Sequence, residues 1–309
     1  MAAKASRQSF GEAIVRIAEK NPQIVVMDAD LGKSTLTGDF AKKFPDRYFE
    51  LGIAEHNLIG TAAGLALGGK IPFATSFSCF LVGRYETIRI SVSYSNANVK
   101  LIGTHAGIGI GEDGNSQMGL EDVALLRSLP NMVILQPADD RETQQAIQWA
   151  ADYVGPVFVR LTRQKLPDVH TDSYQFNMGK ADILKTSPQA KIAVFATGGV
   201  VYNSLKAAEE LEQQGVSVTV VNVHTLKPFD DLLIQQLAKQ HQKFITIEDH
   251  YVIGGLGSAV SEALSDIGAP VKLLRHGVKT FGESGIPEEL YEKFGFSIPK
   301  IKQTILNFI

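Results

Sequence analysis

The amino-acid sequence predicts an α/β fold made of two doubly wound domains with mainly parallel sheets. Short β-branched runs alternate with stretches of helical length and pattern, first over residues 1–165 and again over residues 190–309. Residues 166–189 between them contain prolines, a glycine and many polar residues, without that alternation. Strands that alternate with helices are typical of βαβ units, and 309 residues suffice for two domains. We therefore expect domains at 1–165 and 190–309, joined by a linker at 166–189.

The individual elements follow from the positions of the apolar residues. Runs rich in β-branched residues predict strands at Ile24–Asp28, Ile71–Ala74, Val99–Gly103, Met132–Leu135, Val157–Leu161, Ile192–Ala196, Val216–Val221, Phe244–Ile247 and Val271–Leu274. Helical spacing predicts helices at Ser9–Lys20, His56–Leu67, Gly83–Tyr94, Met118–Leu126, Arg141–Tyr153, Tyr202–Gln213, Asp230–Gln240 and Gly257–Ile267, and two more within Pro287–Ile309. Open parallel sheets bind ligands beyond the carboxyl ends of their strands, so the loops there are the ones to inspect.

Composition argues against several classes of protein. The formal net charge is -3, with Lys+Arg 30 and Asp+Glu 33, which gives no electrostatic signal for nucleic acid or an anionic membrane. We find no signal peptide at the start and no apolar stretch near the ~20 residues that a membrane helix needs. One cysteine, Cys79, cannot form an intrachain disulfide and favours a reducing, cytoplasmic setting.

The loop after Gly103 has an unusual set of polar side chains. It contains a G-x-G-x-x-G string at Gly109, Gly111 and Gly114, but Glu112 and Asp113 within it would repel a pyrophosphate. The loop instead offers an imidazole, a carboxylate and an amide, which suit a polyhydroxylated, anionic small molecule; these are His105, Asp113 and Gln117. A glycine-rich turn with incidental polar residues stays an equal alternative from spacing alone.

Glu55 stands among apolar and small residues where a helix is predicted to begin. A carboxylate at that place is usually a simple cap. The helix that follows is almost wholly apolar or small, however, as expected of a buried interface helix. Phe77 and Phe80 follow the next strand, either as core residues or as a stacking wall for a flat heterocycle.

Together these motifs carry a family resemblance. Leu51–Asn57 followed by Phe77–Phe80 resembles the pyrimidine-binding domain of thiamine diphosphate enzymes, and Gly111–Asp122 narrows the resemblance to transketolases. Three later motifs resemble the transketolase C-terminal domain: Thr197–Gly199, Glu248–Gly255 and Ser284–Pro287. The resemblance covers nearly the whole chain in order.

The resemblance implies roles for individual residues. Glu55 would hydrogen-bond the pyrimidine of thiamine diphosphate and, with His105, be catalytic. The other cofactor-binding residues would be Phe77, Phe80 and Asp30. Substrate would be bound by Arg7, Ser34, His105, Asp113, Gln117 and Arg163. Gln117 departs from the histidine of many bacterial relatives and cannot titrate, which removes any proton transfer at that position.

The resemblance also implies a missing part. We do not find the GDG…N motif that holds Mg²⁺ or Ca²⁺ and the diphosphate, and we expect no metal ligands here; His56, His170, His224, His241 and His276 show no metal-ligand spacing. We expect a separate N-terminal subunit in an α2β2 heterotetramer, which would transfer ketol units between sugar phosphates of the pentose phosphate pathway. The alternatives are a deoxyxylulose-phosphate synthase-like enzyme, a 2-oxo acid dehydrogenase beta subunit, or a non-catalytic scaffold.

Overall fold

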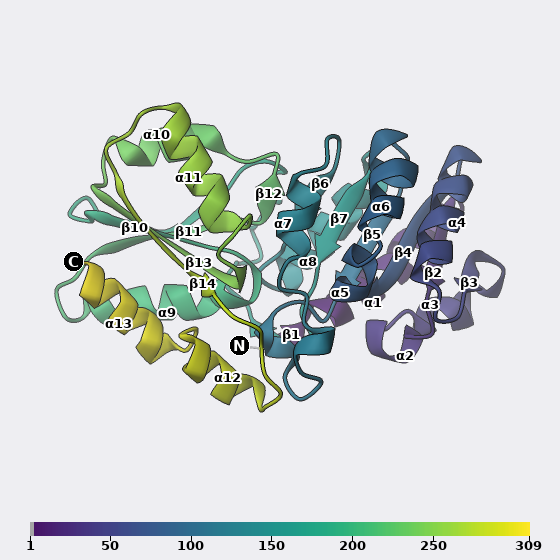
Figure 1. Ribbon diagram of the computed structural model, residues 1–309, viewed down its shortest axis with the longest axis horizontal. Coiled ribbons are helices and arrows are strands. Elements are labelled where there is room, and N and C mark those ends of the chain that lie inside the picture. The colour runs from purple at the N-terminus through teal and green to yellow at the C-terminus, as the bar shows by residue number, and fades with distance from the viewer. Residues whose placement is uncertain (1–2) are drawn as a thin grey trace.

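A computed structural model describes residues 3–309. The chain forms two α/β lobes that lie side by side, the earlier half of the sequence in one and the later half in the other (Figure 1). Each lobe is built around a mostly parallel sheet with helices on both faces. The predicted fold class is therefore confirmed.

The first lobe contains a seven-stranded sheet with the order β12-β6-β7-β5-β4-β2-β3. Six of its strands come from the first half of the chain and run parallel. They are β2 Ile24–Asp28, β3 Tyr48–Glu50, β4 Ile71–Phe77, β5 Lys100–Thr104, β6 Val133–Leu135 and β7 Val157–Arg160. A separate two-stranded ribbon joins β1 Ala3–Ala5 to β8 Lys165–Pro167.

Helices cover both faces of this sheet because their apolar residues recur at helical spacing. On one face, α1 buries Phe10, Ile14 and Ile17 against Ala146 and Ile147 of α8. The α-helices of this lobe are α1 Ser6–Lys20, α2 Gly32–Thr35, α3 Gly38–Lys43, α4 Glu55–Leu67, α5 Ser78–Val82, α6 Tyr85–Thr87, α7 Asp122–Arg127 and α8 Asp140–Asp152. Tighter or wider turns are η1 Pro45–Arg47, the π-helix η2 Ile88–Tyr94, η3 Ile108–Ile110 and η4 Asn115–Gln117.

The second lobe has a five-stranded sheet with the order β14-β13-β10-β11-β9. Its strands are β9 Asp182–Lys185, β10 Ile192–Ala196, β11 Val218–Asn222, β13 Lys243–Tyr251 and β14 Lys272–Val278, of which only β9 is antiparallel to its neighbour. Its helices are η5 Gly198–Val200, α9 Val201–Glu212, α10 Asp231–Ala238, α11 Leu256–Asp266, α12 Pro287–Phe294 and α13 Ile298–Phe308.

The two lobes share structure in ways that the sequence did not indicate. Strand β12 (Thr225–Lys227) comes from the second half of the chain but pairs antiparallel with β6 at the edge of the first sheet. One hydrophobic cluster runs from Leu58 of α4 to Phe195 and Phe244 of the second sheet. The segment 166–189 is also not a free linker throughout, because β9 within it belongs to the second sheet.

Two predicted helices differ from the structure. The helix predicted from Met118 begins at Asp122, because residues 118–121 still belong to the loop that follows η4. The helix predicted over 83–94 is a short α6 followed by the π-helix η2.

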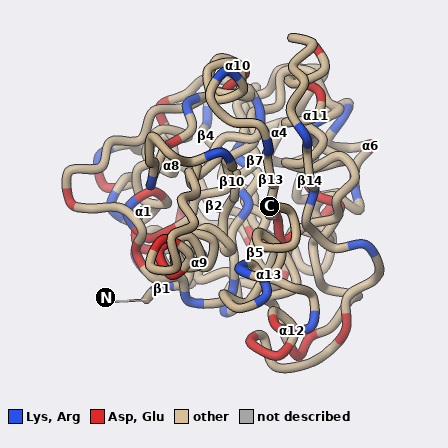
Figure 2. The backbone as a smooth tube through the Cα atoms, turned by 90° about the vertical axis from the view of Figure 1, so that its left-hand side faces the viewer, with Lys and Arg blue, Asp and Glu red and all other residues tan. Residues whose placement is uncertain are grey.

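The surface has no single dominating charge on the side drawn in Figure 2, where lysine and arginine are interspersed with aspartate and glutamate. Across residues 3–309, no helix combines the length and the apolar character required to cross a bilayer.

Candidate active site

Glu55 is the first residue of α4 and its side chain is buried, with only 5% exposed. Its Oε1 accepts a hydrogen bond from Ser76 Oγ at 3.2 Å. Within residues 3–309 we find no backbone amide of α4 that donates to this carboxylate, so it does not act as the helix cap that is the usual interpretation. The carboxyl group is thus held in a buried position, and no residue among 3–309 forms an ion pair with it.

An aromatic wall lies where β4 ends and α5 begins. The rings of Phe77 and Phe80 are nearly parallel, with centroids 5.5 Å apart and an interplanar angle of 9°. Phe77 also stacks on His105 at 3.8 Å, while Phe80 stays partly exposed and lines a cavity of 330 Å³. A partly exposed aromatic ring beside a cavity and near a buried carboxyl group suits a flat heterocycle with a polar edge.

A row of hydrogen bonds runs across the carboxyl ends of β4 and β5. Ser76, which donates to Glu55, also receives a bond at its backbone oxygen from Thr104 Oγ1 at 3.4 Å. Thr104 Oγ1 lies 2.8 Å from His105 Nδ1, and His105 Nε2 lies 3.0 Å from the guanidinium of Arg7. Because Arg7 can only donate, Nε2 accepts and Nδ1 carries the proton. The row fixes one tautomer of His105.

His105 is kept neutral by its surroundings. Burial, together with the charges of Arg7 and Arg163, lowers its pKa to about 3. Its backbone also has a φ of 58°, a strained value for a residue other than glycine and one that occurs preferentially at functional sites.

We expect His105 to remain neutral, with the proton on Nδ1, at every pH from 8 down to about 4. The unfolded chain takes up this proton near pH 6.5, whereas the folded chain does so only near pH 3, so acid favours the unfolded state. This contribution lowers the free energy of unfolding progressively below about pH 6.5. Nitrogen NMR of protein labelled at histidine measures the tautomer and the titration midpoint of His105, whose signal is assigned by its loss in a His105→Gln variant. A titration midpoint near 6.5 would show that Arg7 does not donate to this ring.

Two arginines place positive charge beside His105. Arg7 donates to the backbone oxygen of Ser34 at 2.6 Å, so Ser34 contributes its carbonyl to the cluster. Arg163 donates to the backbone oxygen of Ile110 at 2.6 Å and lies 3.8 Å from the carboxylate of Asp113. Five of the predicted substrate residues therefore converge, and they are Arg7, Ser34, His105, Asp113 and Arg163.

Two other predicted residues, Asp30 and Gln117, form no hydrogen bond or ion pair with this cluster within the described residues. Asp30 is exposed in the loop after β2, with a φ of 62°, and its backbone amide donates to Glu50 at 2.7 Å. Gln117 is partly exposed in η4, and its backbone oxygen accepts from Cys79 Sγ at 3.2 Å, which places it beside Phe80. Cys79 is only half-buried, and burial raises the pKa of its thiol to about 12.

The second lobe holds the loop that follows β5 in place, a contact that the sequence did not reveal. Asp249, fully buried at the end of β13, accepts from the amides of Ile108 at 2.7 Å and Gly109 at 3.3 Å. Tyr291 of α12 donates to the same carboxylate at 2.9 Å. A side chain at Gly107 would collide with Asp249, and its φ of 86° also requires glycine.

A buried ion pair supports the same loop. Arg160 donates through Nε to both carboxylate oxygens of Asp122, at 2.9 and 2.8 Å. Its Nη2 donates to the backbone oxygens of Gly119 at 2.6 Å and Asp249 at 2.9 Å. No spacing in the sequence indicates this contact. It becomes visible only once the fold places these segments side by side.

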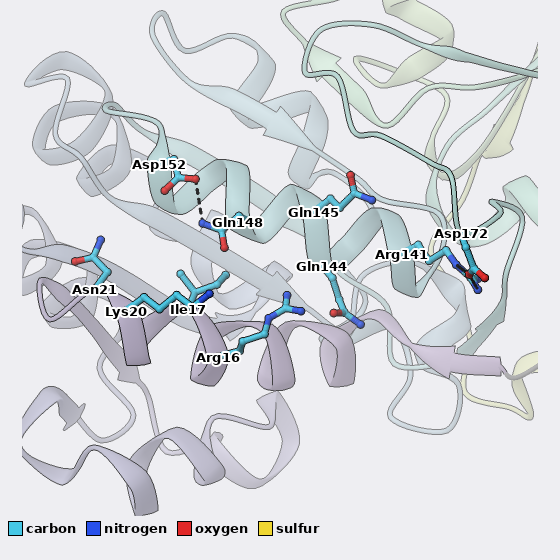
Figure 3. Close-up of a pocket in the computed structure, with 10 residues that line it drawn as sticks. All are labelled: Arg16, Ile17, Lys20, Asn21, Arg141, Gln144, Gln145, Gln148, Asp152 and Asp172. Carbon is cyan, nitrogen blue, oxygen red and sulfur yellow. Dashed lines mark hydrogen bonds and ion pairs between the residues drawn. The ribbon is translucent and has the colours of Figure 1, made fainter.

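A second cavity lies away from these residues. It measures 730 Å³ and opens between α1 and α8, lined by Arg16, Lys20, Gln144 and their neighbours (Figure 3). None of the predicted site residues borders it. Size alone is therefore a poor guide to the site in this chain.

Comparison with known proteins decides the family. A family model of the transketolase pyrimidine-binding domain matches residues 2–169, and one of the transketolase C-terminal domain matches residues 179–301. The chain belongs to the transketolase family. Family membership implies dependence on thiamine diphosphate, and the relatives are transferases.

Individual relatives match over most of their length. The chain is 42% identical to the "Putative transketolase C-terminal section" of Methanocaldococcus jannaschii, over 98% of this chain and 96% of that protein. It is 38% identical to the "6-deoxy-6-sulfo-D-fructose transketolase subunit SqwH" of Clostridium sp. (strain MSTE9), over 96% and 91%. A solved structure described as "Split gene transketolase, inactive beta4 tetramer" superposes with a TM-score of 0.88 at 41% identity, covering 99% of this chain and 98% of that one.

These relatives place the chain with C-terminal sections of split transketolases. The expectation of a transketolase C-terminal half is thus confirmed at the level of the family and of the section.

Proposed function

We propose that this chain is the catalytic C-terminal subunit of a split transketolase, which moves a two-carbon ketol unit from a ketose phosphate to an aldose phosphate. The observation that carries the proposal is the row of hydrogen bonds from Glu55 through Ser76, Thr104 and His105 to Arg7. It joins a buried acid beside an aromatic wall to a cationic cluster. A cofactor group and an anionic sugar could therefore meet at one place.

The residues of the aromatic wall fit the pyrimidine of thiamine diphosphate. Phe80, backed by the parallel ring of Phe77, would stack on the heterocycle, and Asp30 would lie nearby. Glu55 would hold a proton at the pyrimidine ring nitrogen, protected from water by its burial. The cofactor, when bound, supplies a nucleophilic carbon and an electron sink for ketol transfer.

The cationic cluster fits the substrate. Arg7 and Arg163 would bind the terminal phosphate, because their planar forks match its geometry. His105, neutral with a lone pair on Nε2, can accept a hydrogen bond from a sugar hydroxyl. Asp113 and Gln117 would contact further hydroxyls, Gln117 without taking part in proton transfer.

A second chain would supply the diphosphate site, including the Mg²⁺ or Ca²⁺ ion, in an α2β2 heterotetramer. The names of the relatives support this: one is a C-terminal section and another a subunit, and they align over 96% and 91% of their lengths. The related structure described as a beta4 tetramer is also described as inactive. We place the enzyme in the cytoplasm and the pentose phosphate pathway as part of the same proposal.

Substrate choice tests the proposed reaction. With the partner chain and cofactor present, we expect transfer of the ketol unit from xylulose 5-phosphate to ribose 5-phosphate. Chromatography of the products measures this transfer. A sulfonated ketose is a second donor to include, because one relative is named for it. Consumption of pyruvate instead would assign the chain to one of the alternative thiamine diphosphate enzymes.

Arg163→Met is expected to raise KM for a phosphorylated ketose by roughly 10- to 100-fold, the value of one or two charge-assisted hydrogen bonds. The KM for the same ketose without phosphate should barely change, and kcat should fall little. Steady-state kinetics with both donors measure this. Lys165→Met, exposed two residues further along, is the matched control. Equal losses with both donors would mean that Arg163 supports the loop rather than the phosphate.

A further inference from the structure

A second group of convergent polar side chains lies where α8 of the first lobe meets β9 and β11 of the second. Glu142, Asp182 and His224 each offer one ligand atom, and these atoms all lie within 4.8 Å of one another. The Nε2 atom of His170 lies 3.8 Å from Glu142 and 3.7 Å from Asp182. We call these four residues the interlobe cluster; none of them belongs to the candidate active site.

Several atoms of the cluster are buried without a hydrogen-bond partner. Within the described residues these include His170 Nε2, His224 Nε2 and Asp182 Oδ2. His224 Nε2 is 3.6 Å from Asp182 Oδ2, too far for a good hydrogen bond. Ligands about 2.0–2.1 Å from a tetrahedral zinc ion stand roughly 3.3 Å apart, so the observed spacing is close to that of a ligand shell.

The far side of each imidazole is already engaged. His170 Nδ1 lies 2.9 Å from Asp139 Oδ2, and His224 Nδ1 lies 2.9 Å from Thr225 Oγ1. The carboxylate behind His170 favours the tautomer that leaves Nε2 free, as it does behind metal-bound histidines. The Thr225 hydroxyl can accept as well as donate, so it permits the same tautomer of His224. Both Nε2 lone pairs can therefore face the centre of the cluster.

The Glu142 carboxylate is held as well. Glu142 Oε1 accepts from Tyr174 at 2.7 Å and from Asn222 at 2.8 Å. Arg141, the preceding residue of α8, pairs with Asp172 and donates to the backbone oxygen of His170, not to the carboxylates of the cluster (Figure 3). The side chain of Asp182 is 31% exposed, although its Oδ2 atom is buried, so the cluster lies just beneath the surface.

We propose that the interlobe cluster binds one divalent transition-metal ion, best fitted by zinc, through Glu142, Asp182 and His224, with His170 as a further ligand. Mixed imidazole and carboxylate donors suit zinc and its neighbours, whereas Mg²⁺ and Ca²⁺ prefer oxygen alone. Because the ligands come from both lobes, the ion would fasten α8 to the second sheet. The proposal does not depend on the proposed function.

A proton on His170 is the competing explanation. Burial lowers the pKa of this imidazole, but the hydrogen bond to Asp139 and the nearby carboxylates of Asp182 and Glu142 outweigh burial and raise it to about 10. A protonated His170 would pair with the carboxylates and repel a cation. The two explanations therefore exclude one another near neutral pH.

Metal titration of the full chain decides between them. The protein, freed of metal by dialysis against a chelator, is titrated with Zn²⁺ in competition with a chromophoric chelator and separately with Co²⁺. We expect one ion per chain, the visible absorption of tetrahedral Co²⁺, and a higher Tm with Zn²⁺. His224→Gln and Asp182→Asn should each weaken binding at least tenfold. His241→Gln, at a buried histidine whose ring nitrogens face Thr219 and Leu237, should not.

Two results would overturn the proposal. One is failure of the wild-type chain to bind Zn²⁺ or Co²⁺ at stoichiometric concentration. The other is binding that His224→Gln and Asp182→Asn leave unchanged while both variants keep the wild-type circular dichroism spectrum.

Discussion

Replacing Glu55 by glutamine in the assembled enzyme is expected to lower kcat for ketol transfer by at least about 100-fold, the scale of a lost acid–base group. Glutamine keeps the shape of the side chain and can still accept from Ser76. It cannot exchange a proton with a pyrimidine nitrogen. Stopped-flow or steady-state assay of the ketol transfer, with matched partner and cofactor concentrations, measures the change.

The melting temperature should stay close to that of the unaltered chain. Within residues 3–309 Glu55 forms no ion pair, and glutamine can keep the hydrogen bond from Ser76. Glu210→Gln, on the exposed side of α9, is the control and should keep full activity. An unchanged rate in Glu55→Gln would favour the alternative of a non-catalytic scaffold subunit.

Arg160→Met should lower the free energy of unfolding by about 3–5 kcal/mol, because it leaves the buried Asp122 carboxylate without its counter-charge. Arg160 and Asp122 are both almost fully inaccessible to solvent, with 1% and 0% of their side chains exposed. The variant also removes two hydrogen bonds to the backbone of Gly119 and Asp249. Chemical denaturation followed by circular dichroism gives the difference.

Two comparisons sharpen this result. Arg16→Met, on an exposed part of α1, should change the free energy of unfolding by less than about 0.5 kcal/mol. The double variant Arg160→Met with Asp122→Leu should recover part of the loss, since no unpaired charge remains. A double variant as unstable as the sum of its parts would show that packing, and not the ion pair, accounts for the effect.

The sequence predicted the elements whose signal is local. Strands such as Ile24–Asp28 and Ile192–Ala196 were located to the residue, because four or five consecutive apolar positions are buried there. The short strands β9 and β12 gave no such signal, unlike the equally short β6 and β7; pairing with a neighbouring strand defines them. The π-helix η2 was likewise not predictable from helical spacing.

The candidate site was predictable where a residue stands in a recognisable motif. Glu55, Phe80 and His105 do, and the structure connects them; their roles remain predictions. Asp249 and Arg160 act by contacts across 38 to 141 residues of sequence, so only the fold reveals them. The same holds for His170 and His224. Their spacing in the sequence does not resemble that of metal ligands, yet the fold brings both close to Asp182.

The division of labour between two chains is the central claim, and mixing tests it most directly. This chain, the diphosphate-binding chain of the same organism, and an equimolar mixture are each assayed for ketol transfer with thiamine diphosphate, Mg²⁺, xylulose 5-phosphate and ribose 5-phosphate. We predict activity only in the mixture, at a rate that saturates at one copy of each chain. Full activity of this chain alone, or none in a mixture whose complex is seen by gel filtration, would contradict the claim.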